Sequence, residues 1–266
     1  MKNSTMASKA MWIPPYFYKY FVPQLYILSD VGMIKISASI AAADPLNLGS
    51  EVRRLEEAGV DYIHVDVGDG YFVDDVGFNP HTVRRIREVT SLPIQVHLMA
   101  YNSEKFAEIY VKYAHEVIVH VEPTPHVLRV VRRVKSLGVK AGVAILPGTA
   151  VSSLRYLIPY VDSVLVITNN DSSFYSWVDR ELIPEMLDKI REVSALKQQL
   201  NNAINVIADG GINTSNVREV VRAGASVITM GSALFSSGNV REVVESIRLI
   251  ASSSDIHGGR GVSGAY

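Results

Sequence analysis

The sequence contains no cysteine among its 266 residues, so neither a disulfide framework nor a cysteine-based metal site is possible. It has no excess of positive charge, because 26 Lys and Arg stand against 27 Asp and Glu, whereas a dedicated nucleic-acid-binding protein is normally basic. It also lacks an uninterrupted apolar run of the ~18 residues that a membrane span needs. Disorder of the whole chain is excluded because 48% of the residues are hydrophobic. These absences predict a soluble globular protein that binds neither nucleic acid nor membrane.

The two ends of the chain lack the periodic patterns found elsewhere. Residues 1–33 hold seven of the 22 aromatic residues but no continuous apolar stretch of the kind that marks a signal peptide. We expect either an irregular N-terminal extension or a true translation start at Met33, because chain termini are usually poorly ordered unless tied down. Residues 252–266 are rich in Ser and Gly without periodicity, which predicts a flexible C-terminal tail.

Between these ends, residues 34–251 repeat one unit, in which a short β-branched run is followed by a turn and a stretch with helical spacing. The predicted strands cover residues 34–40, 62–67, 94–99, 116–121, 140–146, 163–168, 205–209 and 226–231. The predicted helices cover residues 48–58, 82–89, 103–114, 127–137, 151–157, 181–196, 216–223 and 240–250.

This alternation predicts a parallel sheet covered by helices, and eight units predict closure into a single (β/α)8 TIM barrel, an α/β fold. An open doubly wound sheet is the alternative, although no G-x-G-x-x-G motif follows the first strand.

Polar side chains are expected at the carboxyl ends of the strands, where barrel enzymes have their active sites. Residues 62–67 alternate apolar and polar, so His64 and Asp66 point into the barrel while the apolar face meets the helices. His97 has a similar position on the third strand, and Asp209 ends the seventh. Any one of them could be an ordinary core or capping residue, but two imidazoles and two carboxylates together are a plausible ligand set for zinc, iron, manganese or cobalt.

Glycine-containing loops follow the last two barrel strands. Gly210 and Gly211 come directly after the seventh strand, and Gly231 and Ser232 follow the eighth. Glycine lets backbone N–H groups approach an anion, and this part of a barrel is a frequent phosphate site. A tight turn and a simple helix cap would explain each loop alone. Because both loops show the pattern, we predict a phosphate site.

Together these motifs resemble the ribulose-phosphate 3-epimerase family. The matching stretches, in family order, are Ser37–Ile40 with Asp44, Ile63–Gly70, Val96–Met99, His120–Glu122, Lys140–Ala144, Asp209–Ile212 and Gly231–Phe235. The resemblance implies a metal-dependent epimerase of the pentose phosphate pathway that inverts C3 of a ketose phosphate, converting D-ribulose 5-phosphate to D-xylulose 5-phosphate. It also implies a cytoplasmic homo-oligomer.

The resemblance implies that one divalent metal ion is held by the four residues at the family's metal-ligand positions: His64, Asp66, His97 and Asp209. Asp66 and Asp209 are also the family's acid/base pair, which transfers protons through a metal-stabilised enediolate. The substrate-binding positions fall on Ser39, His97, Met99, Gly210, Gly211, Gly231 and Ser232.

The loop 169–177 departs from the family, because it is longer than the family's lid and contains no glycine. Two alternatives therefore stay open: an epimerase of a 6-phosphohexulose, and a catalytically silent barrel that binds a sugar phosphate. His120 could face the barrel mouth from the fourth strand, although a structural role is the simpler interpretation.

Overall fold

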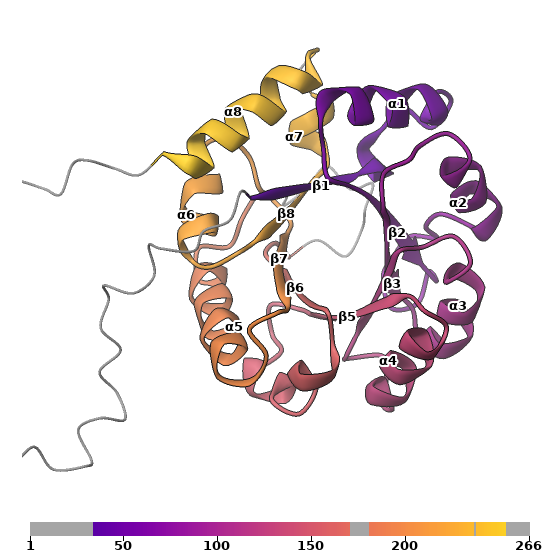
Figure 1. Cartoon of the computed structure of the whole chain (residues 1–266), viewed down its shortest axis with the longest axis vertical. Coiled ribbons are helices and arrows are strands. Elements are labelled where there is room, and N and C mark those ends of the chain that lie inside the picture. The colour runs from indigo at the N-terminus through magenta and orange to yellow at the C-terminus, as the bar shows by residue number, and fades with distance from the viewer. Residues whose placement is uncertain (1–33, 171–180, 237, 254–266) are drawn as a thin grey trace, which may run out of the picture. The chain divides into compact units, whose positions relative to one another are not determined.

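The computed structural model describes residues 34–170, 181–236 and 238–253. Within these residues, eight parallel strands pair in sequence order and close into a barrel, because β8 pairs with β1 (Figure 1). The strands are β1 Lys35–Ser39, β2 Tyr62–Gly68, β3 Ile94–Met99, β4 Glu116–His120, β5 Lys140–Ile145, β6 Ser163–Ile167, β7 Asn205–Asp209 and β8 Val227–Met230. The predicted (β/α)8 barrel is confirmed, and the open sheet is wrong.

Helices surround the barrel and cover its outer face (Figure 1). They are α1 Leu48–Ala58, α2 Pro80–Arg87, α3 Ser103–Tyr110, α4 Val127–Ser136, α5 Met186–Leu200, α6 Val217–Arg222, α7 Ser232–Phe235 and α8 Val240–Ser252. Their apolar stripes pack against the outward-facing strand residues in one continuous hydrophobic core. No helix in the described part of the chain is both long enough and apolar enough to cross a membrane.

Two helix predictions need correction. Residues 151–157 do not form an α-helix; the 3-10 helix η3 Val151–Leu154 stands there, and a second 3-10 helix, η4 Ile158–Tyr160, follows it. A segment this short forms few i→i−4 hydrogen bonds, and such segments commonly adopt 3-10 turns. Helix α5 begins at Met186 rather than at residue 181, because Pro184 disfavours helical backbone at the residue before it.

Some sequence predictions fall outside the described residues. The N-terminal extension 1–33, loop residues 171–177 and tail residues 254–266 belong to this group. The tail was expected to start at residue 252, but α8 includes Ser252.

The interior of the barrel is built in layers. Five buried apolar side chains form a cluster separate from the outer core: Ile118, Ala144, Leu165, Ile207 and Val227. Each lies two residues before a residue that lines the cavity at the barrel mouth, so period-two alternation places this cluster as a floor beneath that cavity.

A buried polar network inside the barrel joins residues of β1, β3, β4 and β6. Gln95 accepts a hydrogen bond from Ser37 at 2.5 Å and donates one to Glu116 at 2.7 Å, and Ser163 also donates to Glu116 at 2.6 Å. The Glu116 carboxylate is therefore buried with both of its oxygen atoms hydrogen-bonded.

Candidate active site and metal centre

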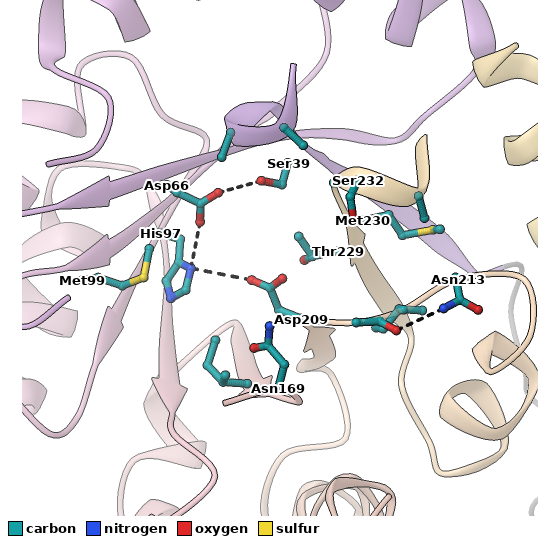
Figure 2. A pocket seen from close by; sticks show the side chains of 18 of the residues that line it. Ser39, Asp66, His97, Met99, Asn169, Asp209, Asn213, Thr229, Met230 and Ser232 are labelled. Atoms are coloured by element: carbon teal, nitrogen blue, oxygen red, sulfur yellow. Dashed lines mark hydrogen bonds and ion pairs between the residues drawn. The ribbon is translucent and has the colours of Figure 1, made fainter. Parts of the chain in front are cut away.

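A cavity of about 390 Å³ opens at the carboxyl ends of the strands, a size suited to a small molecule (Figure 2). The predicted site residues that line it are Ser39, Asp66, His97, Met99, Asp209, Gly210, Gly211, Gly231 and Ser232. His64 does not line the cavity, and its side chain is fully buried.

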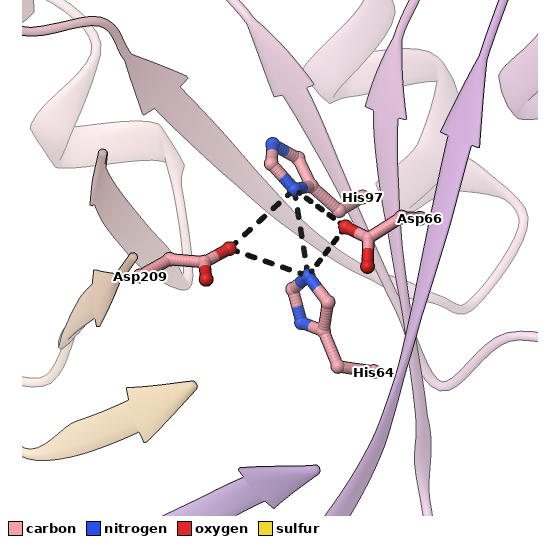
Figure 3. A group of neighbouring side chains, drawn as sticks. All are labelled: His64, Asp66, His97 and Asp209. Carbon is pink, nitrogen blue, oxygen red and sulfur yellow. Dashed lines mark hydrogen bonds and ion pairs between the residues drawn. The ribbon is translucent and has the colours of Figure 1, made fainter. Parts of the chain in front are cut away.

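The side chains of His64, Asp66, His97 and Asp209 converge, with one nitrogen or oxygen atom of each within 4.8 Å of all the others. His64 Nε2 lies 3.2 Å from Asp66 Oδ1 and 3.6 Å from Asp209 Oδ2. His97 Nδ1 lies 3.3 Å and 3.7 Å from the same two oxygen atoms. The two carboxylates stand on opposite sides of the imidazole pair (Figure 3). Closure of the barrel thus brings together residues that are far apart along the chain.

Burial and mutual charge shift the pKa values of all four groups. Burial opposes ionisation of Asp66, but the charge of adjacent His64 and the close contacts with the imidazoles of His64 and His97 hold its pKa well below the usual range. Burial, together with the charge of Asp66, raises the pKa of Asp209 to about 6. Burial lowers the pKa of His97 to about 4, with help from neighbouring His120 and His64.

His64 behaves differently. Its burial disfavours the cation, but the charges of Asp66 and Asp209 outweigh that effect and raise its pKa to about 9. Two carboxylates can share this buried space only with positive charge beside them. A divalent cation would supply that charge, and the imidazole nitrogen and carboxylate oxygen donors match zinc, iron, manganese or cobalt. The residues present therefore fit a metal site.

Hydrogen bonds outside the cluster orient its members. Ser39 Oγ donates to Asp66 Oδ2 at 2.7 Å, which leaves Oδ1 facing the two imidazoles. Ser39 ends β1, next to β2 in the barrel, so the bond joins adjacent strands.

The glycine loops form the cavity wall across from Met99, as the position of Ser232 in Figure 2 shows. Gly210 and Gly211 have left-handed φ angles of 118° and 69°. The carbonyl groups of both glycines are held, because Thr168 Oγ1 donates to Gly210 O at 2.5 Å and Asn216 Nδ2 donates to Gly211 O at 2.8 Å. The loop after β7 therefore has a defined backbone.

Among the cavity residues that were not predicted as site residues, His120 and Thr229 stand out by their surroundings. His120 Nε2 lies 2.9 Å from His97 Nε2, and Thr229 has a buried hydroxyl with no hydrogen-bond partner among the described residues. Period-two alternation could have found both, because each stands two residues after an inward-facing residue of the floor. The simpler, structural interpretation of His120 overlooked its contact with His97, which depends on the packing of two different strands.

Comparison with known proteins gives the following matches. The model for the ribulose-phosphate 3 epimerase family matches residues 35–235. The ribulose-phosphate 3-epimerase of Synechocystis sp. is 36% identical over 218 residues, covering 81% of this chain and 93% of that protein. The enzyme of the same name from Bacillus subtilis is 34% identical, covering 81% and 99%.

Solved structures support the fold alone, because their sequence identity is low. The 3-hexulose-6-phosphate synthase of Salmonella typhimurium is 16% identical, with a TM-score of 0.61, over 82% of this chain and 98% of that one. The orotidine 5'-phosphate decarboxylase of Pyrococcus horikoshii is 17% identical, with a TM-score of 0.59, over 82% and 100%.

Proposed function

The chain belongs to the ribulose-phosphate 3-epimerase family, and we propose that it inverts C3 of a ketopentose phosphate, interconverting D-ribulose 5-phosphate and D-xylulose 5-phosphate. The observation that carries this proposal is the placement of Asp66 and Asp209 on opposite sides of one buried imidazole pair, at the base of a cavity rimmed by glycine loops.

Inversion requires that a proton leave one face of C3 and that another arrive on the opposite face. Asp66 comes from β2 and Asp209 from β7, so a substrate carbon held between them meets a carboxylate on each face. One carboxylate accepts the proton as general base, and the other delivers a proton as general acid. Their roles exchange when the reaction runs in reverse.

We further propose that His64, Asp66, His97 and Asp209 hold one divalent metal ion, either zinc, iron, manganese or cobalt. Bound there, the ion supplies Lewis acidity that stabilises negative charge on the substrate oxygens when C3 loses its proton. The chain itself orients the carboxylates: Ser39 holds Asp66, and the buried imidazoles keep both carboxylates at the cavity base.

The remaining contacts position the substrate. The phosphate binds in this proposal at the loops with Gly210, Gly211, Gly231 and Ser232, where backbone N–H groups can approach it closely. Met99 provides an apolar wall across the cavity from them.

The alternatives have less support. A 6-phosphohexulose was suggested by the loop 169–177, most of which lies outside the described residues. A catalytically silent barrel is disfavoured because both carboxylates of the acid/base pair reach the cavity. The homo-oligomeric state and the cytoplasmic location stay predictions.

The test is deuterium exchange at C3 of D-ribulose 5-phosphate in D₂O. A ketohexose 6-phosphate is assayed in parallel as the competing substrate. Wild-type protein should exchange the pentose substrate, and Asp66→Asn or Asp209→Asn should each lower the rate on the order of 10²–10⁴-fold. Asp188→Asn, on the exposed face of α5, is the matched control and should leave the rate unchanged. Wild-type exchange of only the hexose, or full activity in either site variant, would contradict the proposal.

A further inference from the structure

His120 links the proposed metal site to a neighbouring carboxylate. Its Nε2 atom lies 2.9 Å from Nε2 of His97, and the two rings stack with centroids 5.0 Å apart. Its other ring nitrogen, Nδ1, lies 3.0 Å from Oε2 of Glu122. The His120 side chain is only 1% exposed, so water contributes little to these contacts. Neither His120 nor Glu122 has a part in the proton transfer proposed above.

Glu122 is itself held firmly. Its second oxygen, Oε1, accepts hydrogen bonds from the backbone N–H of Leu146 at 2.8 Å and from Thr149 Oγ1 at 2.5 Å. Lys189 of α5 donates to the carbonyl oxygens of Leu146 at 2.9 Å and Thr149 at 2.7 Å, which ties this loop to the outer helix. The carboxylate therefore has a fixed position from which it can orient His120.

The protonation of Glu122 follows from these donors. Burial opposes its ionisation, but the hydrogen bonds from His120, Leu146 and Thr149 outweigh burial and lower its pKa to about 2. An ionised carboxylate only accepts hydrogen bonds. The proton between Glu122 and His120 must then be carried by Nδ1 of His120.

The proton on Nδ1 of His120 determines the direction of the next hydrogen bond and the tautomer of His97. In a neutral imidazole, a proton on Nδ1 leaves a lone pair on Nε2, which can only accept a hydrogen bond. His120 Nε2 thus accepts from Nε2–H of His97. Neutral His97 with its proton on Nε2 has its lone pair on Nδ1, the atom that faces Asp66, Asp209 and His64 (Figure 3).

We propose that Glu122 and His120 are positioning residues that hold His97 in the tautomer whose Nδ1 lone pair faces the metal ion. This inference rests on the metal site of the proposed function and extends it by two residues. Residues that hydrogen-bond to the far nitrogen of a histidine ligand fix both its tautomer and its ring orientation, and their loss typically costs about 10–100-fold in metal affinity.

The experiment measures Zn²⁺ affinity of the full chain by competition with a chromophoric chelator. His120→Phe keeps a ring between Phe72 and His97 but removes the acceptor, and should weaken Zn²⁺ binding about 10–100-fold. His120→Gln retains an amide oxygen that can accept from His97, and should recover part of the affinity. His81→Phe on the exposed face of α2 is the control and should bind as wild type does.

The outcomes separate the two proposals. If wild type binds Zn²⁺ and His120→Phe binds it equally well, the positioning role is wrong and the metal site stands. If wild type does not bind any of Zn²⁺, Mn²⁺ or Co²⁺, the metal site is wrong and the positioning role falls with it.

Nitrogen-15 spectra of the histidine side chains provide a test that needs no variant, should His120→Phe fail to fold. In Zn²⁺-loaded wild type, His120 should carry its proton on Nδ1 and His97 should carry its proton on Nε2. The opposite tautomer at either residue would overturn the inference.

Discussion

Asp66 and Asp209 reach the same two imidazole nitrogens from opposite sides, and Asp66 is the closer of the two to both nitrogens. The Asp66 side chain is also less exposed, at 9% against 19% for Asp209. The site is therefore asymmetric, with one carboxylate set deep among the histidines and the other nearer to the cavity. Both depend on positive charge between them, which makes metal removal the most direct perturbation.

Removal of the metal ion should abolish C3 exchange and lower thermal stability. A ligand that binds only the folded state stabilises it by about 2.7 kcal/mol when its concentration is 100 times its dissociation constant. We expect chelator-treated protein to lose exchange and to regain both properties with Zn²⁺, Mn²⁺ or Co²⁺, measured by isotope exchange and thermal unfolding. The stabilisation should shrink in Asp209→Asn. Full exchange in protein shown to be metal-free would contradict this prediction.

Ser39→Ala should disturb Asp66 without disrupting the barrel. It removes a donor 2.7 Å from Asp66 Oδ2, and hydrogen bonds to charged groups contribute about 1.5–3 kcal/mol. We expect the C3 exchange rate to fall roughly tenfold or more, because each ~1.4 kcal/mol of lost transition-state stabilisation lowers the rate about tenfold. Ser37→Ala is the matched control, because Ser37 lies on the same strand but bonds to Gln95. Equal rate losses in the two variants would show that the Ser39–Asp66 bond has no special role.

Thr229→Val should weaken substrate binding without lowering the stability of the fold. The Thr229 hydroxyl is buried in the cavity wall without a partner among the described residues, and an unpaired buried polar group costs about 1–3 kcal/mol. Its removal should leave the unfolding free energy equal or higher. If the substrate supplies the missing partner, KM should rise roughly 3–10-fold, which corresponds to one hydrogen bond. Denaturant unfolding and steady-state kinetics measure both, and an unchanged KM would contradict a substrate contact.

Gly210→Ala should damage both the loop and the cavity. Gly210 has a φ of 118°, and an added Cβ would lie 2.5 Å from Asn169 Oδ1. Strain of this kind costs about 1–3 kcal/mol, so we expect a lower unfolding midpoint and weaker substrate binding. Gly49→Ala is the control, because Gly49 lies in α1 with open space around it and should become slightly more stable. A Gly210→Ala protein as stable as wild type would show that the loop can relax.

The stability of the metal-free protein should depend on Glu122 at acidic pH. The pKa of Glu122 is about 2 in the folded chain, against a usual value of 4.5. A lowered pKa means that the carboxylate stabilises the fold above pH 4.5 and that this contribution disappears as the pH falls toward 2. Glu122→Gln should therefore cost roughly 2–3 kcal/mol at pH 7 and much less near pH 2, measured by denaturant unfolding. A pH-independent difference between the two proteins would contradict the assigned carboxylate bonds.

The sequence by itself determined the order of strands and helices and the inward direction of His64 and Asp66. Both follow from local periodicity, since a strand buried against helices must turn its apolar face outward. The two glycines after β7 could also be predicted, because Gly210 and Gly211 have positive φ angles that only glycine adopts without strain. The α-helix expected over 151–157 does not form, because so short a segment gains few intrahelical hydrogen bonds and adopts 3-10 turns instead.

Only the tertiary structure decided which side chains touch. Sequence periodicity placed His97 on an inward face and allowed His120 to face the barrel mouth, but their 2.9 Å contact depends on the register of β3 against β4. The missing partner of Thr229 likewise depends on what the closed barrel places around it. Distances, burial and pKa shifts arise between strands that are remote along the chain, so they exist only once the barrel has closed.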